Sequence, residues 1–332
     1  MNPVYFEGNM ASWQADMVST FIRMIVKRRP EGSESEADIV KHIRSRLELS
    51  EFIRSLITSV DARAVGVVRD GSVKGEWLRP AGEPRQTVYY LHGGAYVACS
   101  PETHRAFTSA LSREANARVF ALDYRLAPEH RFPAAVEDAL AGYRWLLDQG
   151  VDPQEIVIGG DSAGGGLTMA TLVALRDAGE PLPRAAFVIS PWTDLACAGR
   201  SLDANDERDP MFYGAGVRWM APVYLGGASP RDPLASPIYA DLSKLPPLLI
   251  HVSDSEVLLD DSTRLADRAK QCGVNVDLRV WNDLPHAWPV FVALRMPESF
   301  QALGEIARFI QQTGGVVNPT ASTTDSGVSA KA

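Results

Sequence analysis

The sequence predicts an α/β fold in which a mostly parallel central sheet is flanked by helices. Short apolar runs alternate with amphipathic helical stretches, and a glycine-rich turn lies between one such run and the helix after it. Alternation of this kind indicates crossover connections, which leave helices on both faces of a parallel sheet. The predicted strands are 87–91, 117–122, 155–158, 185–189, 248–252 and 276–281, after a hairpin formed by 64–68 and 73–78. The predicted helices are 104–114, 134–148, 165–178 and 260–271.

Two segments depart from the alternation. Residues 1–60 show apolar positions three and four residues apart, including Phe21 and Ile22, so they are expected to be helical. These helices either pack onto the core or form a lid over a pocket. Residues 195–237 contain no clear strand but are rich in aromatic side chains, and we interpret them as an insertion over the sheet.

The tail 314–332 has no periodicity and is expected to be disordered.

Composition narrows the possible functions. The 332 residues include 45% hydrophobic and 22% charged residues, typical of a globular protein. Acidic residues outnumber basic ones, 41 to 33, without a basic stripe, so nucleic acid is not an expected partner. Three widely spaced cysteines predict neither a disulfide framework nor a zinc site. No secretion signal or membrane-spanning run is evident, so a cytoplasmic location without membrane insertion is expected.

The glycine-rich turn predicts a nucleophilic serine. Residues 160–164 read G-x-S-x-G with Ser162 at the centre, directly after a predicted strand and before a predicted helix. On a tight strand-to-helix turn the serine hydroxyl is exposed, and glycines at the flanking positions relieve crowding between strand and helix. Phosphate-loop and dinucleotide-binding patterns are absent from this turn. Ser162 is therefore the candidate nucleophile.

A second glycine pair predicts an oxyanion hole. Residues 92–95, His-Gly-Gly-Ala, follow the strand 88–91 and precede the serine by about seventy residues. Acyl transfer needs N–H groups fixed where the carbonyl oxygen becomes negative, and small residues allow the backbone to approach closely. We expect the N–H groups of Gly93, Gly94 and Ala163 to form this hole.

Three linked blocks of sequence resemble the bacterial hormone-sensitive-lipase-like esterases, a branch of the α/β-hydrolases. They are 92–95, 123–130 with 132–135, and 160–165, and the resemblance extends over roughly residues 88–309. The middle block is the longest and most specific, and its role is expected to be structural. Ala95 departs from the family pattern, which has a third glycine there, but an alanine still offers its N–H.

The resemblance implies an α/β-hydrolase fold with a helical cap. Residues 1–60 would be the N-terminal cap segment, 61–313 the catalytic domain and 195–237 the cap insertion within it. It also implies hydrolysis of short- to medium-chain acyl esters without a cofactor or metal, and it makes a homodimer a possible assembly. Trp13, Phe21, Met211, Phe212 and Trp219 are candidate walls of the substrate pocket.

His286 is the predicted general base. It follows the last predicted strand, where an α/β-hydrolase carries its base, and the chain order serine, acid, histidine is then preserved. Histidine suits proton transfer near neutral pH. The other five histidines lie in the 92–95 loop, the middle block, helices or a strand, where a structural role is expected.

The acid is predicted to be Glu256, with Asp254 as the alternative. Both follow the strand 248–252. Aligning Leu258 and Asp260 with the family pattern places the acid at Glu256, although aspartate is the commoner triad acid and Asp254 lies nearer the strand end. Asp260 and Asp261 are expected to cap the following helix.

Together these residues predict acyl transfer through a covalent acyl-serine. Two other classes of function remain open. An amidase or acyltransferase could use the same residues, and a non-catalytic binding protein could share the fold. The latter predicts a lost base, so the presence of Ser162 with His286 disfavours it.

Overall fold

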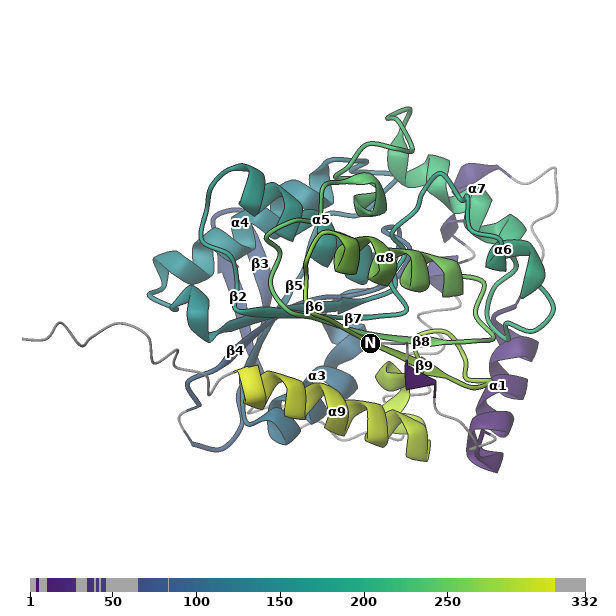
Figure 1. Ribbon diagram of the computed structural model, residues 1–332, viewed down its shortest axis with the longest axis horizontal. Helices are drawn as coiled ribbons and strands as arrows, with labels where there is room; N and C mark the ends of the chain where they lie inside the picture. Colours follow the sequence, from purple (N-terminus) through teal and green to yellow (C-terminus); the bar gives the residue numbers. More distant parts are fainter. Residues whose placement is uncertain are drawn as a thin grey trace, which may run out of the picture.

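The computed structural model describes residues 11–27, 35–38, 40–41, 43–45, 65–82 and 84–313, together with the backbone of residues 4–5. A single sheet runs through the centre, with helices on both faces (Figure 1). Its nine strands follow the order β1-β9-β8-β7-β6-β4-β5-β3-β2. The strands are β1 (Val4–Tyr5), β2 (Val65–Asp70), β3 (Val73–Leu78), β4 (Thr87–Leu91), β5 (Arg118–Leu122), β6 (Ile156–Asp161), β7 (Ala185–Ile189), β8 (Leu248–Ser253) and β9 (Val276–Trp281).

The sheet is mostly parallel, as predicted. Strands β2 and β3 form an antiparallel hairpin and β3 pairs antiparallel with β5, whereas every other pairing is parallel. Strands β4, β6 and β7 are buried along their whole length, which explains their continuous apolar sequence. Parallel strands end at a common edge, so the loops after β4, β6, β7, β8 and β9 meet there.

Helices cover the two faces unequally (Figure 1). On one face lie α3 (Arg105–Ala115) and α9 (Pro297–Thr313); on the other lie α4 (Ala134–Asp148), α5 (Ala163–Asp177) and α8 (Leu259–Gln271). Almost every residue of α5 is buried, so this helix is the central one of its layer. Short 3-10 helices are η2 (Glu102–His104), η3 (Pro153–Glu155), η4 (Pro237–Tyr239) and η5 (Trp288–Leu294).

The N-terminal segment is only partly the helix that we predicted. Helix α1 (Trp13–Ile25) confirms the first apolar pattern, but β1 pairs parallel with β9 at the sheet edge, where a helix was expected. Two residues are too few to show a strand period in the sequence. Most of the second predicted helical stretch, and the tail 314–332, lie outside the described residues, although 43–45 are helical.

The insertion 195–237 contains α6 (Ser201–Ala204) and α7 (Gly214–Leu225) and no strand, as predicted. Helix α1 is bound to it: Arg23 donates to the carbonyls of Glu207 and Arg208, and Lys27 to those of Asp206 and Asp209. These four hydrogen bonds join the end of α1 to the insertion. In the part of the chain that the structure describes, every helix is too short or too polar to cross a bilayer.

Candidate active site

Ser162 lies on a sharp turn between β6 and α5. Its φ of 54° and ψ of −123° fall outside the regions that side-chain-bearing residues ordinarily adopt. The neighbouring strand and loop hold this conformation, because its N–H donates to the carbonyl of Ile189 at 2.8 Å and its own carbonyl accepts from Gly166 and Trp192. The strain is therefore built into the end of the sheet. It presents the hydroxyl at the N-terminus of α5, where the helix dipole favours negative charge.

The flanking glycines are required by space. A Cβ on Gly160 or on Gly164 would collide with the carbonyl oxygen of Leu91, the last residue of the neighbouring strand β4. Leu91 pairs directly with Gly160 in the sheet, so the backbone cannot retreat without breaking the register. The turn can therefore approach β4 closely only with glycine at both positions.

The loop after β4 lies against this turn, but Gly93 does not have the role that we predicted. Its N–H donates to the carboxylate of Asp161 at 2.9 Å, inside the protein, and is not available to an oxyanion. The N–H groups of Gly94, Ala95 and Ala163 donate to no other described residue. Gly94 and Ala95 both have positive φ, 116° and 54°. The Gly93 assignment is thus wrong, because a buried carboxylate occupies its only donor.

Asp161 is a buried anchor for this loop. Its Oδ1 also accepts a hydrogen bond from the Tyr90 hydroxyl at 2.6 Å and lies 3.3 Å from His104 Nε2. Burial alone would raise the pKa of Asp161, but the charge of His104 and the hydrogen bonds from His104 and Tyr90 lower it to about 2. The carboxylate is therefore ionised and holds Gly93 firmly.

The middle block supports the same loop from its other side, in agreement with a structural role. The Tyr124 hydroxyl donates to the His92 carbonyl at 2.6 Å, and the N–H of Ala127 donates to the Tyr96 carbonyl at 2.8 Å. The Tyr124 ring also stacks on the His92 imidazole, with centroids 4.2 Å apart. The 92–96 backbone is consequently fixed at both ends.

His286 and Glu256 form a buried pair at the same edge of the sheet. His286 Nδ1 donates to Glu256 Oε2 at 2.6 Å, and both side chains are almost completely excluded from solvent. The other ring nitrogen, Nε2, is buried and has no hydrogen-bond partner among the described residues. Burial alone would lower the pKa of His286, but Glu256, with smaller contributions from Asp209 and Asp161, raises it above its ordinary value.

Glu256 is held by groups that the sequence analysis did not identify. Its second oxygen, Oε1, accepts from the Ser190 hydroxyl at 2.7 Å and from the Ser253 N–H at 2.8 Å. The Ser190 oxygen in turn accepts from the N–H of Ala287 at 3.1 Å. Ser190 follows Ile189, which binds the backbone of Ser162. Ser190 therefore links the loops that carry the serine, the acid and the histidine.

One signal could have found Ser190. It is a polar residue directly after the fully apolar strand β7, a position equivalent to that of the serine turn after β6.

Asp254, the alternative acid, contacts other groups: its carboxylate pairs with Arg208 and accepts from the N–H of Asp283. The Asp254 carboxylate makes no hydrogen bond to His286.

Three other described histidines, His92, His104 and His251, are buried away from the pair of His286 and Glu256. His92 and His251 are fully buried, and burial lowers the pKa of each to about 3, so neither is a useful base near neutral pH. His104 binds Asp161, as described above. His42 lies outside the described residues.

Asp260 and Asp261 do not cap α8, contrary to our expectation. Both lie within its first turn, and the residue at the cap position is Leu258. Asp260 instead accepts from the N–H groups of Arg200 and Ser201, at 2.6 and 3.2 Å. Asp261 accepts from Thr193 and Asp194, at 2.8 and 2.9 Å. Their carboxylates thus tie the start of the insertion to α8.

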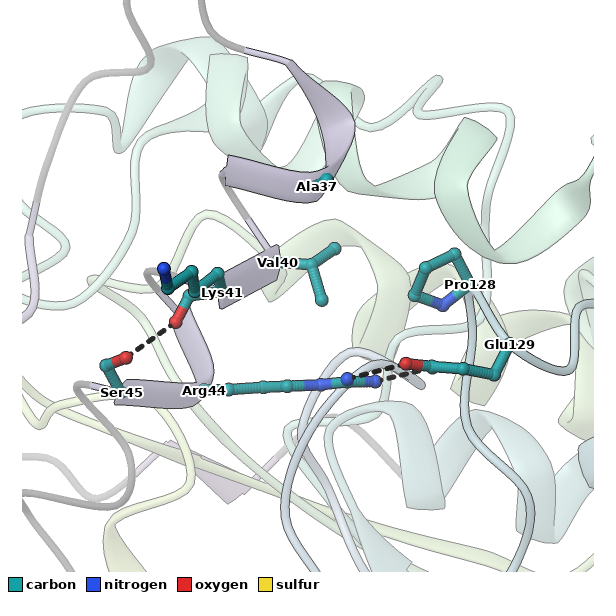
Figure 2. A pocket seen from close by; sticks show the side chains of 7 residues that line it. All are labelled: Ala37, Val40, Lys41, Arg44, Ser45, Pro128 and Glu129. Carbon is teal, nitrogen blue, oxygen red and sulfur yellow. Dashed lines mark hydrogen bonds and ion pairs between the residues drawn. The ribbon is translucent and has the colours of Figure 1, made fainter.

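A cavity of about 310 Å³ lies between the N-terminal segment and the middle block (Figure 2). Arg44 crosses one side of it and forms two hydrogen bonds with Glu129, at 2.7 and 2.8 Å. The same guanidinium donates to the carbonyls of Val97 and Ala127. The cavity is lined by Ala37, Val40, Lys41, Arg44, Ser45, Pro128 and Glu129. It contains none of the predicted catalytic residues, but it shows that the N-terminal segment contacts the loop beyond Gly94.

Of the predicted pocket residues, Phe212 contacts His286. Its ring meets the His286 imidazole edge-on, with centroids 5.1 Å apart. Trp13 and Phe21 are 67% and 46% exposed and project away from the core. Within the described residues, no group of three or more histidine, cysteine, aspartate or glutamate side chains has an arrangement that could hold a metal ion.

Comparison with known proteins gives consistent matches. The model of the α/β-hydrolase fold family matches residues 88–290. An acetyl-hydrolase from Streptomyces hygroscopicus is 47% identical over 249 residues, 75% of this chain and 83% of that protein. The esterase LipU of Mycobacterium tuberculosis is 34% identical over 278 residues, 82% and 91% of the two chains. The crystal structure of an esterase from the bacterial hormone-sensitive lipase family superposes with a TM-score of 0.82 and 44% identity, covering 92% of this chain and all (100%) of that one.

A mostly parallel sheet with a serine turn after one strand and a buried histidine–carboxylate pair after two others has the arrangement of an α/β-hydrolase. The chain belongs to the α/β-hydrolase family, in its bacterial hormone-sensitive-lipase-like branch. It is a carboxylic ester hydrolase, like the relatives that it matches over most of their length.

Proposed function

We propose that this esterase hydrolyses short- to medium-chain acyl esters through an acyl-enzyme formed on Ser162. His286 is the general base and Glu256 the acid of the triad. The observation that carries the proposal is the buried 2.6 Å contact between His286 Nδ1 and Glu256 Oε2, which leaves Nε2 without a partner among the described residues. A carboxylate on Nδ1 fixes the tautomer in which Nε2 can accept a proton.

The reaction proceeds in two displacements. The Ser162 hydroxyl attacks the ester carbonyl while His286 Nε2 takes its proton, forming a tetrahedral oxyanion. His286 then returns that proton to the departing alcohol, and the carbonyl of the acyl-serine re-forms. Water attacks the acyl-serine with His286 again as base, which releases the carboxylic acid and restores the serine. Glu256 stabilises the imidazolium in both steps.

The oxyanion is held by the N–H groups of Gly94, Ala95 and Ala163 in this scheme. The availability of these donors supports the assignment, since Gly93 is bound to Asp161. Ala163 begins α5, so its N–H has no acceptor within the helix. Donors that are already oriented contribute strongly because no reorganisation is needed as negative charge develops.

Bulky aromatic side chains near the nucleophile support a preference for small acyl groups. The N–H of Trp192 donates to the Ser162 carbonyl, and the Trp192 ring lies 6.3 Å from that of Tyr96. Tyr96 stacks on Tyr224 of α7, with centroids 3.8 Å apart. In this proposal the buried rings beside the serine turn limit the length of the acyl chain. The similarity to an acetyl-hydrolase agrees with this preference.

The experiment is a chain-length series of p-nitrophenyl esters, from acetate to dodecanoate, on the wild type and on Ser162→Ala. We expect kcat/KM to be highest for acyl chains of two to about eight carbons and to fall for the long ones. Ser162→Ala should lose hydrolysis of every ester while its circular dichroism and melting temperature remain those of a folded protein. A folded Ser162→Ala that still turned over the acetate would overturn the mechanism. A maximum at dodecanoate would overturn the acyl preference alone.

A further inference from the structure

The insertion between β7 and β8 makes direct hydrogen bonds to the backbone of the loop that carries the acid. We propose that Asn205 and Asp209, both in this insertion, are positioning residues of the triad. They fix the peptide group between Glu256 and Val257, and Asp209 also places a ring against His286. The inference rests on the triad proposed above. The insertion is then part of the catalytic geometry.

Asn205 holds the carbonyl end of this peptide group. Its Nδ2 donates to the carbonyl of Glu256 and to that of Asp254, both at 2.8 Å. The side chain is buried, and its own N–H closes the turn of α6 onto the Ser201 carbonyl. An amide group with two N–H hydrogens can serve two acceptors at once, which a hydroxyl or a methyl group could not.

Asp209 holds the N–H end of the same peptide group. Its Oδ2 accepts from the N–H of Val257 at 2.9 Å, and its side chain is completely buried. The C=O of Glu256 and the N–H of Val257 are therefore both fixed by insertion side chains four residues apart. Rotation of this peptide would move the Glu256 backbone to which the side chain is attached, and with it the carboxylate that binds His286.

The other carboxylate oxygen of Asp209, Oδ1, helps to position His286. Oδ1 accepts from the N–H groups of Met211 and Phe212, at 2.7 and 3.0 Å. These bonds fix the turn from which the Phe212 ring meets the edge of the His286 imidazole, at 5.1 Å and an interplanar angle of 68°. One buried carboxylate thus reaches Glu256 through Val257 and His286 through Phe212.

The chemistry of these contacts makes Asp209→Asn a sharp test. All three groups bound to the carboxylate are backbone N–H donors, which suits two acceptor oxygens. An asparagine of the same shape must direct its own NH₂ group at Val257, or at Met211 and Phe212. Either orientation breaks one of the two connections without creating a large cavity.

A matched control exists at the same edge of the sheet. Asp261 also has a fully buried carboxyl group that accepts backbone N–H bonds, from Thr193 and Asp194, but this group makes no hydrogen bond to Ser162, Glu256 or His286. Both bonds end on Oδ1, so Asp261→Asn replaces a buried carboxyl group by an amide of the same shape while leaving the Glu256–Val257 peptide untouched. Asn205→Ala is the second variant. It removes the hydrogen bonds from the Asn205 amide to the carbonyls of Asp254 and Glu256, and its methyl group places no new N–H group opposite another donor.

The test measures kcat and KM for p-nitrophenyl acetate, the rate constant for inactivation by phenylmethylsulfonyl fluoride, and the urea unfolding midpoint. Inactivation reports the reactivity of Ser162 toward a small reagent. For Asp209→Asn and Asn205→Ala we expect kcat and the inactivation rate to fall together by about 10- to 100-fold, with KM changed less than about threefold. Asp261→Asn should keep both rates within about threefold, whatever it costs in stability.

Wild-type rates in folded Asp209→Asn and Asn205→Ala would overturn the inference. Equal losses in Asp261→Asn would do the same, because the effect would then reflect general destabilisation. Ser162→Ala is measured in the same assays. If Ser162→Ala retains turnover, the proposed function is wrong. If Ser162→Ala is inactive but Asp209→Asn is fully active, only the positioning role of the insertion is wrong.

Discussion

Glu256→Gln tests the acid assignment through the hydrogen bonds around the carboxylate. Oε1 receives two donors, the Ser190 hydroxyl and the Ser253 N–H. The NH₂ group of a glutamine cannot face both of them, so its carbonyl oxygen takes that side and its NH₂ points at His286 Nδ1. His286 must then accept at Nδ1 and carry its proton on Nε2, the nitrogen that should take the serine proton.

The magnitude follows from this tautomer. Where an amide replaces the triad acid and leaves the geometry intact, the loss of kcat is about 10⁴-fold in the well-studied serine proteases. We expect a decrease of about 10³- to 10⁴-fold here, with KM for p-nitrophenyl acetate changed by less than about threefold, since the acid does not touch the substrate. The melting temperature should change little because glutamine matches the volume, keeps the two bonds at Oε1 and only reverses the direction of the third, to His286.

Asp254→Asn is the matched comparison, measured in the same assay. Asp254 lies two residues away, is 31% exposed at its side chain and pairs with Arg208 instead of a histidine. Its replacement should leave kcat within about threefold of the wild type, as for most surface substitutions. If Asp254→Asn lost more activity than Glu256→Gln, or if Glu256→Gln kept over a tenth of the wild-type kcat, the assignment would be wrong.

Three other predictions concern the groups around the triad. Ser190→Ala removes a hydrogen bond to the buried Glu256 carboxylate, which is worth about 1.5–3 kcal/mol, and should lower kcat about 10- to 100-fold. An unchanged kcat would show that the Ser253 N–H alone holds the carboxylate in place. Gly164→Ala has no room for its Cβ and should yield little soluble, folded protein in an expression and melting assay, whereas a wild-type melting temperature would refute the packing argument. Since the base must be neutral and the pKa of His286 is raised, kcat/KM should fall with decreasing pH and reach half its plateau above pH 6.5. A midpoint below 6.5 would contradict this.

The sheet and the serine turn were predictable because their signals are local. Apolar runs such as 185–189 match β7 residue for residue, and a serine between two glycines identifies the turn after β6. Helix α9 received no prediction, although Leu303, Ile306 and Ile310 recur at helical spacing and are buried. The short strand β1 has no such signal, since it exists only by pairing with β9.

What could not be predicted are contacts between residues far apart in the chain. Gly93 looked like an oxyanion donor from its sequence, and only the position of Asp161, 68 residues later, shows that its N–H is occupied. Asn205 lies 51 residues from Glu256, and nothing in its surroundings in the sequence distinguishes it from a surface amide. Such contacts arise from how the insertion folds back over the sheet edge, which hydrophobic periodicity does not encode.

The proposal that Ser162 is the nucleophile activated by His286 is best tested by covalent labelling of the reactive serine. The protein is treated with phenylmethylsulfonyl fluoride, and its intact mass and tryptic peptides are measured. We expect one sulfonyl group per chain on the peptide containing Ser162, none on Ser162→Ala, and strongly slowed labelling of His286→Ala. An adduct on a different serine, or equal labelling of Ser162→Ala, would contradict it.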